Sequence, residues 1–499
     1  MRFSLTRWSF FVWCCAMMLV TAMVQHQSFF WDTVMLASQQ AQWFYEHGAK
    51  PFPSVIDVGH PPLLPAYLAS LWRMFGQSLE VSHWAMLPFL WLIVWAVHRL
   101  AEQVYPYFGV NSPLLILALS TLLLLQPTLL AQATLISPDI PLCAFFLCAL
   151  WHFLQPEGKQ WRGFYAIWLI LLSFTSLRGV IAVALFAGAE GAWLLLEHMP
   201  SPTTWKSFAR ALMSSARAYL PALLLFGLWY RWHSATTGSI GWHDTSSSEF
   251  YRTFWDISGL VKNEVVFVWR LVDFGAGAVW IVLGASMYRL FRQSRRCGES
   301  FFATVFEVLP QRLCVLAALS FVAWMLIVAV VPTYSISHRY FLPMQFLASI
   351  GAVLGLFGRT PLSAHKLHIY AVVCVVLLTG HCWAWFYPRT LAKGWDATLA
   401  YLPYDGLRKQ VLRGIQARGI SATDIQSRNF ATFPARDLDL TPQADTTRCG
   451  ASTLGSTRYV FFASVLNGFS NEEIHALQGW KCIECAEAWG IVVEVRERP

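Results

Sequence analysis

The chain has 499 residues, of which 56% are hydrophobic and only 13% carry a charged side chain. Because a soluble domain carries roughly a quarter charged residues, this composition excludes a wholly soluble protein and predicts one that crosses a membrane many times. The formal net charge of +8 calls for no nucleic acid partner, since it follows from basic residues that gather on one side of the membrane.

About eleven apolar runs are long enough to cross ~30 Å of hydrocarbon. In chain order they lie near 9–24, 84–104, 113–132, 138–155, 161–177, 179–196, 216–233, 264–290, 312–332, 339–357 and 367–386. Lys and Arg favour the N-terminus and every second loop, most clearly the loop that holds Arg289, Arg292, Arg295 and Arg296. This bias predicts a cytoplasmic N-terminus and, with an odd number of spans, a C-terminus outside.

The segment between the first two runs is too long and too amphipathic to be a simple loop. Apolar and glutamine side chains alternate over 32–47, a pattern typical of a helix that lies in the membrane interface. Prolines then interrupt the chain, and 63–75 is predicted as a second apolar helix. Asp32 opens the first helix, whereas Asp57 and His60 precede the second.

A second outside loop covers about 234–262 and is rich in Ser, Thr, Gly and Trp. Its length and polarity suit a mobile lid over a site. Trp242 and Trp255 are its candidates for contact with a sugar or a lipid. Lys262 is a candidate phosphate ligand, although a solvated loop cation is the favoured interpretation.

The tail from about 390 onward has the composition of a soluble domain, so we divide the chain into a membrane body, 1–389, and an outside domain, 390–499. Its periodicity predicts a small α/β or α+β fold. The predicted elements are a helix at 403–418, a strand at 459–466, a helix that starts near Ser470 and a strand at 491–495.

Three cysteines lie in this tail, Cys449, Cys482 and Cys485. The last two have CxxC spacing, but a structural zinc site needs four ligands. A disulfide in an oxidising compartment is therefore the better hypothesis. The sequence leaves open which two cysteines pair.

Two acids begin helices at the outside rim. Asp32 follows the first span within FFWDTV, and Asp139 opens a later span within SPDIPL. Each has an ordinary alternative as a helix N-terminal acid, worth roughly 0.3–1 kcal/mol. Together, two carboxylates that face one cavity are what divalent metal binding or acid–base catalysis requires. The sequence leaves both chemistries open.

Cations gather at the same rim. His338, Arg339 and Tyr340 open another span from the outside, within SHRYFLPM. They are candidates for binding the phosphate or sugar of a donor, and Arg339 is expected to neutralise the phosphate as it leaves. Arg178 lies between two spans, where snorkelling to the interface competes equally with phosphate binding. Elsewhere, Arg270 and Asp273 stand three residues apart within the eighth run and are expected to form a structural ion pair.

Four of these motifs together carry a family resemblance. The early rim Asp, the HPPL loop that enters a second interfacial helix, SPDIPLCAFFLCAL and SHRYFLPM follow the order and side of the membrane seen in GT-C glycosyltransferases. More narrowly, the chain resembles the branch that holds the protein O-mannosyltransferases and the lipid A aminoarabinose transferases. The resemblance covers about residues 1–390.

The resemblance implies a donor sugar on a polyprenyl phosphate. It places the family's first acid at Asp32, its later acid at Asp139 and its HxRY-like element at His338, Arg339 and Tyr340. Two departures stand out. Thr33 occupies the place of the family's usual Glu, and His60 stands where the family often has Lys before the diproline. His60 can still donate a hydrogen bond to a phosphate or a sugar hydroxyl.

We therefore expect an all-α polytopic membrane protein, GT-C-like, with two juxtamembrane helices and a small outside domain. The expected activity is sugar transfer from a polyprenyl-phosphate donor to a lipid, glycan or protein acceptor that faces the periplasm of a bacterial inner membrane. No cofactor is required by the motifs, and a divalent metal on Asp32 and Asp139 is left open. The alternatives are a polyprenyl-lipid transporter or flippase and a non-catalytic accessory subunit that binds such lipids.

Overall fold

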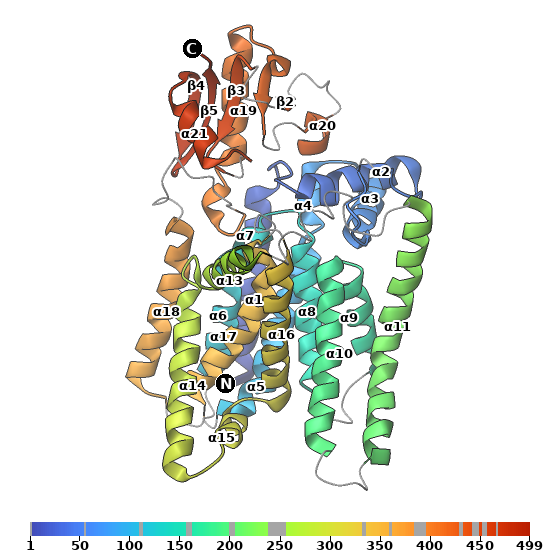
Figure 1. Cartoon of the computed structure of the whole chain (residues 1–499), viewed down its shortest axis with the longest axis vertical. Helices are drawn as coiled ribbons and strands as arrows, with labels where there is room; N and C mark the ends of the chain where they lie inside the picture. Colours follow the sequence, from blue (N-terminus) through green and yellow to red (C-terminus); the bar gives the residue numbers. More distant parts are fainter. Residues whose placement is uncertain are drawn as a thin grey trace.

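A computed structural model shows a tall helical body with a small domain of mixed structure at one end (Figure 1). The structure describes residues 2–53, 56–108, 113–155, 162–198, 205–237, 256–331, 336–358, 362–383, 396–428, 433–441, 449–451, 457–465 and 468–499.

Most long helices of the body stand roughly parallel to one another in Figure 1, and these together with shorter helices make up the body. They are α1 (Arg2–Val24), α4 (Leu79–Trp84), α5 (Leu87–Val104), α6 (Pro113–Leu124), α7 (Pro127–Ala133), α8 (Asp139–Phe153), α9 (Arg162–Ser173), α10 (Leu177–His198), α11 (Trp205–Thr237), α13 (Ile257–Val272), α14 (Gly277–Cys297), α15 (Phe301–Val308), α16 (Gln311–Val330), α17 (Leu342–Phe357) and α18 (Ala364–Trp383). Short 3-10 turns, η2 (Tyr105–Phe108) and η5 (His338–Phe341), follow α5 and precede α17.

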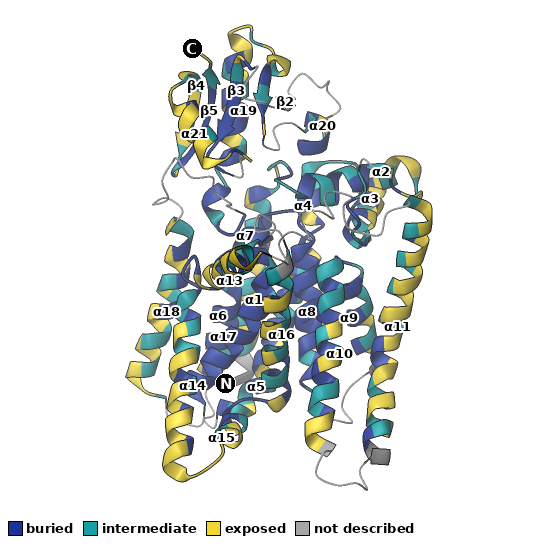
Figure 2. Cartoon of the chain, viewed as in Figure 1, coloured by how far each residue is buried: buried dark blue, intermediate teal, exposed yellow. Residues whose placement is uncertain are grey.

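Burial divides these helices into a core and an outer ring. Helices α8 and α17 are buried along almost their whole length, whereas α11, α14 and α18 expose much of their surface (Figure 2). The exposed surface is apolar and includes Leu228, Ile281 and Val375. An apolar outer ring around an apolar core is expected where lipid, and not water, surrounds the protein.

The described residues contain seven helices that are long and apolar enough to cross a membrane, or up to nine if each of two bent pairs is one span. Two of the eleven predicted spans, at α8 and α9, are shorter apolar helices. Two more are bent pairs, α6 with α7 at 66° and α13 with α14 at 94°. The protein is thus a multi-pass membrane protein.

The sharpest bend corrects the prediction of a continuous eighth span. Helix α13 ends at Val272, and Phe274 and Gly275 take positive φ angles of 52° and 83° before α14 begins. Such angles suit glycine and are costly for other residues. Asp273 stabilises the turn because its carboxylate accepts a hydrogen bond from the Phe274 amide at 2.9 Å. Arg270 and Asp273 consequently do not share the face of one continuous helix.

The first outside loop contains the two predicted interfacial helices. A π-helical turn, η1 (Val34–Gln39), continues into α2 (Gln40–His47), and α3 (Leu63–Phe75) has the predicted bounds. Both helices lie across the end of the body beneath the small domain (Figure 1). Both helices predicted for this loop are therefore present, and its position on the outside of the membrane stays a prediction.

The C-terminal domain is a mixed five-stranded sheet with helices. Strands β1 (Ile425–Ser427), β2 (Gly450–Ala451), β3 (Tyr459–Ala463), β4 (Lys481–Ala488) and β5 (Ile491–Glu497) have the order β2-β1-β3-β5-β4. The first three run parallel, and β5 pairs antiparallel with β3 and β4. The other elements are η7 (Leu399–Tyr401), α19 (Tyr404–Ala417), η8 (Ala422–Asp424), α20 (Ala435–Leu438) and α21 (Asn471–Gln478).

All four predicted elements of the tail are present, and the boundary predicted at 389/390 falls outside the described residues. Ser470 and Glu473 form a capping box at α21, which stabilises that helix start. Strands β1, β2 and β4 were not predicted from the sequence, and β4 carries Cys482 and Cys485. All eleven cysteines are free thiols in this structure, so the predicted disulfide is not formed. Burial raises the pKa of Cys482 to about 11.

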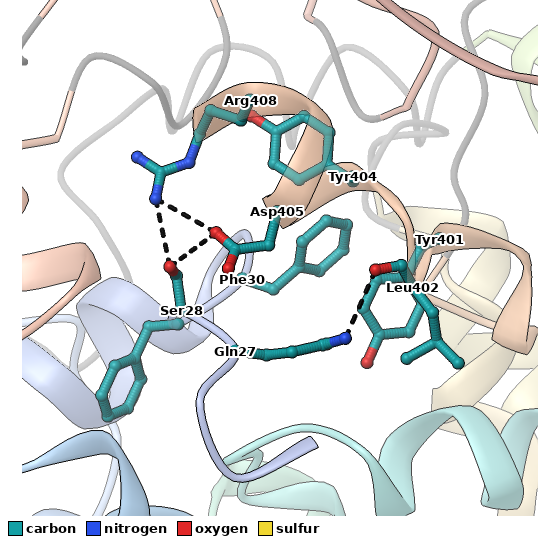
Figure 3. A pocket seen from close by; sticks show the side chains of 9 residues that line it. Gln27, Ser28, Phe30, Tyr401, Leu402, Tyr404, Asp405 and Arg408 are labelled. Atoms are coloured by element: carbon teal, nitrogen blue, oxygen red, sulfur yellow. Dashed lines mark hydrogen bonds and ion pairs between the residues drawn. The ribbon is translucent and has the colours of Figure 1, made fainter. Parts of the chain in front are cut away.

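A polar cluster joins the C-terminal domain to the first outside loop (Figure 3). The Arg408 guanidinium, 2% exposed, donates to Ser28 at 3.1 Å, to Asp405 at 3.1 Å and to Asp439 at 2.9 Å. Burial opposes the ionisation of Asp405, but Arg408 and Lys409 hold its pKa below the ordinary value. Because Ser28 lies just ahead of the first interfacial helix, this cluster ties the domain to the rim of the body.

Replacing Arg408 by glutamine is expected to loosen this attachment. Two partly buried carboxylates would lose their main cation, at a cost of about 1.5–3 kcal/mol, the range for hydrogen bonds to charged groups. Thermal unfolding and the rate of tryptic cleavage of the purified protein measure the effect. Arg413→Gln is the matched control, because Arg413 is exposed on the same helix and donates to the Lys409 carbonyl. Equal behaviour of the two variants would contradict the assigned role of Arg408.

Candidate active site

A buried arginine forms the centre of the candidate site. Arg339, in η5 and 4% exposed, binds both carboxylate oxygens of Asp32, with Nη1 at 2.9 Å from Oδ1. Its Nη1 also lies 3.1 Å from Asp396 Oδ2, and its Nε lies 3.5 Å from Asp139 Oδ2. Three carboxylates from three distant parts of the sequence therefore surround one guanidinium, which repays part of the large cost of burying each charge.

A second arginine extends this cluster. Arg178, on the first turn of α10, forms an ion pair with Asp139. Its guanidinium also lies over the ring of Tyr340, 4.3 Å from the ring centroid, and Arg339 lies 5.5 Å from the same ring. Both guanidinium groups therefore lie within cation–π distance of the Tyr340 ring, which favours both cations. The structure brings together Asp32, Asp139, Arg178, Arg339 and Tyr340, as the sequence predicted for one rim.

Local sequence explains the positions of Asp139 and Arg178. Asp139 is the first residue of α8, where the helix dipole favours an acid, and Ser137 donates to its carboxylate at 3.1 Å. The dipole of α10 disfavours a cation at the start of that helix. The ion pair with Asp139 compensates for this unfavourable position of Arg178. The start of α10 packs closely on the end of α9, and this requires glycine at position 179, because a Cβ there would overlap the carbonyl oxygen of Leu172.

Asp396 was not predicted as a site residue from the sequence. It lies after the last span, in a region assigned to a separate soluble domain, and no motif marks it. Its side chain is buried, and Gln132 of α7 donates to its backbone oxygen at 2.8 Å. Burial raises the pKa of Asp396 above the ordinary value, although the Arg339 guanidinium acts in the opposite direction. The only sequence signal is an acid that directly follows a tryptophan near the end of the last span.

His338 belongs to a neighbouring cluster and does not face Asp32. Its Nε2 lies 2.9 Å from Asp273 Oδ2 and 3.4 Å from Arg270 Nη1, and Phe274 packs against its ring. Arg270 also donates to the Ile336 carbonyl. The bend between α13 and α14 thereby holds His338, and His338 in turn precedes Arg339 in the chain.

The remaining predicted residues are dispersed. Asp57 pairs with His233 of α11 at 3.2 Å, with both side chains 5% exposed, and so connects the first loop to α11. His60 is half-buried, whereas Lys262 is exposed on α13. Trp242 and Trp255 lie outside the described residues, as does most of the predicted lid.

The described side chains do not fit the divalent metal that the sequence left open. Asp32 and Asp139 are each ion-paired to an arginine, and a metal ion would have to replace these cations. Among the described residues, no group of three His, Cys, Asp or Glu side chains is placed to hold a metal ion. We therefore derive no chemical step through a metal.

Comparison with known proteins places this geometry in a fold. No protein-family model matches the sequence, and no curated protein matches it significantly. The structure is similar to ArnT from Cupriavidus metallidurans, solved bound to undecaprenyl phosphate and in the apo state, with a TM-score of 0.51 and 13% identity over 97% of each chain. It is also similar to the arabinofuranosyltransferase AftD from Mycobacteria, with a TM-score of 0.48 and 14% identity over 98% of this chain and 40% of that one.

At this identity the likeness concerns the fold. It extends over the body and the C-terminal domain alike, since 97% of the chain is covered. Together with the apolar helices and the two juxtamembrane helices, it shows that this multi-pass membrane protein has the GT-C fold.

Proposed function

We propose that this protein is a glycosyltransferase that moves a sugar from a polyprenyl-phosphate donor to a lipid, glycan or protein acceptor on the periplasmic side of a bacterial inner membrane. The observation that carries the proposal is the Asp32–Arg339 pair at the rim of a GT-C body, with Asp139 and Arg178 beside it. The similar protein ArnT binds undecaprenyl phosphate in one of its structures, which supports a polyprenyl phosphate as the lipid of the donor here.

Asp32 is our candidate for the general base. Its side chain is 26% exposed, whereas those of Asp139 and Asp396 are 1% and 7% exposed. Of these three carboxylates, Asp32 is therefore the one that an acceptor hydroxyl can reach. The bidentate contact with Arg339 fixes its orientation, and a positioned base contributes typically 10²–10⁴-fold to a rate.

Arg178 is our candidate for the cation that stabilises the departing phosphate. Its side chain is 14% exposed, compared with 4% for Arg339. Arg339 was predicted to meet the phosphate, and that role stays a prediction, because its guanidinium already neutralises three carboxylates. In the proposed reaction the acceptor oxygen attacks the anomeric carbon, its proton passes to Asp32, and the bond to the lipid phosphate breaks with inversion.

The test is sugar release from a panel of radiolabelled polyprenyl-phosphate sugars. Wild-type protein and Asp32→Asn are compared in membranes that contain candidate acceptors, each with and without chelator. We expect the wild type to consume one donor, and the variant to bind it while losing at least about 100-fold in turnover. Unchanged turnover in the chelator arm agrees with a donor set that does not fit a metal.

Two results would contradict the proposal. Movement of the polyprenyl lipid across the bilayer without sugar release would indicate a transporter or flippase. Binding of the lipid with neither movement nor release would indicate an accessory subunit, in line with Thr33 in the place of the family's acid. Equal turnover by Asp32→Asn would leave the transferase activity intact and remove Asp32 as its base.

A further inference from the structure

A segment beyond the last span contacts the candidate site through Asp396, which lies 3.1 Å from Arg339. We call residues 396–405 the strap. The Asp396 backbone is held by Gln132, the Leu399 amide donates to His381 Nδ1 at 3.0 Å, and the Tyr401 hydroxyl lies 2.5 Å from that of Thr134. These partners belong to helices of the membrane body or lie beside them, so the strap is fixed to the body and not only to the C-terminal domain.

The far end of the strap is fixed to the first outside loop. The Tyr401 ring packs against Phe30, with centroids 4.6 Å apart, and Gln27 donates to the Leu402 carbonyl at 3.3 Å. Asp405 accepts from Ser28 at 2.6 Å (Figure 3). The strap therefore touches the chain directly ahead of Asp32 at one end and reaches Arg339 through Asp396 at the other.

Asp396 and Asp32 share one nitrogen of Arg339. Nη1 carries two hydrogens and lies 2.9 Å from Asp32 Oδ1 and 3.1 Å from Asp396 Oδ2. A guanidinium held on both sides of Nη1 cannot rotate in its own plane without losing one partner. Asp139 faces Nε from a third side, while Arg178 and the Tyr340 ring close the cluster.

Asp396 is poorly explained as a structural ion pair alone. Asp32 already provides Arg339 with a bidentate partner, and a third buried carboxylate adds repulsion between acids as well as attraction to the arginine. The third acid, Asp396, fixes the orientation of the Arg339 guanidinium group that binds Asp32.

We infer that Asp396 is a positioning residue, by which the strap orients Arg339 and, through it, the Asp32 carboxylate toward the acceptor. The C-terminal region thus completes the active site. The catalytic part of this inference rests on the proposed function, whereas the coupling between Asp396, Arg339 and Asp32 can be measured without activity.

The coupling is tested by a double-mutant cycle in thermal unfolding. Asp32→Asn, Asp396→Asn and the double variant are purified in the same detergent as full-length protein. Each single variant leaves Arg339 one strong anionic partner, but the double variant leaves only the longer contact with Asp139. We expect the loss of Tm in the double variant to exceed the sum of the single losses by about 3 °C.

Kinetics separate positioning from simple loss of folded protein. We expect Asp396→Asn to lower kcat about tenfold with the donor KM within about twofold, and Asp396→Ala to lower kcat further, because asparagine keeps an oxygen that accepts from Nη1. Asp424→Asn is the matched control, since Asp424 is an exposed acid of the same domain. It is expected to change neither Tm nor kcat.

Additive Tm losses would overturn the inference, whatever the activity. If the Tm losses were additive and Asp396→Asn also kept a normal kcat, Asp396 would neither position Arg339 nor contribute to turnover. A wild-type protein that consumes no donor would defeat the proposed function, and the unfolding cycle alone would then decide whether Asp396 positions Arg339 and Asp32.

Discussion

Arg339→Gln is expected to destabilise the protein by about 3–5 kcal/mol and to abolish turnover. The substitution leaves three carboxylates, Asp32, Asp139 and Asp396, close together without the cation that they share. Removing one partner of a buried ion pair costs this much because the remaining charge stays buried. Arg339→Lys is expected to recover part of the stability but little turnover, because an ammonium cannot reproduce the planar fork.

Thermal unfolding and donor turnover of the purified variants check this prediction. Arg436→Gln serves as the control, because Arg436 is 56% exposed in its side chain and pairs with Glu46 at 2.9 Å. An exposed pair of this kind is worth at most about 1 kcal/mol. If Arg339→Gln unfolded at the wild-type temperature, the three carboxylates could not be ionised around a shared arginine as we describe.

Gly380→Ala is expected to destabilise the protein by about 1–3 kcal/mol or more, although alanine normally favours a helix. Gly380 lies in α18 against the bend between α13 and α14, and a Cβ there would overlap the carbonyl group of Phe274. Backbone atoms cannot move aside as a flexible side chain can. The bend would have to shift, and with it the Asp273 carboxylate that holds His338.

A matched glycine shows whether this effect is local. Gly191 lies inside α10, and a Cβ at that position meets no atom within 4 Å. Gly191→Ala is therefore expected to keep or raise the melting temperature, by up to about 1 kcal/mol in stability. We expect Gly380→Ala also to lower turnover, since the bend is connected to Arg339 through His338. Equal melting temperatures for the two variants would show that the bend does not pack on α18 as described.

The sequence determined the elements whose signal is local. Hydrophobic runs located the membrane helices, because a span needs a continuous apolar segment. The prolines before the apolar run at 63–75 located the start of α3, because proline is tolerated at the start of a helix but not in its interior. The run IVVEV at 491–495 predicted β5, because β-branched residues favour strands. Asp139 was also predicted as an acid at a helix start, because the residue type and its place in the first turn can both be read from the neighbouring sequence.

Only the tertiary structure decided which charges meet. The bend at Asp273 and Phe274 depends on a buried partner, His338, and on a glycine of another helix, so no local pattern reveals it. Asp396 meets Arg339 because the strap packs against α7, α18 and their neighbours, and such long-range contacts depend on how the whole chain packs. The sequence alone therefore located the rim and most of its charged residues. The packing decided that Arg339 contacts three carboxylates, because a buried charge is stable only where groups of opposite charge surround it.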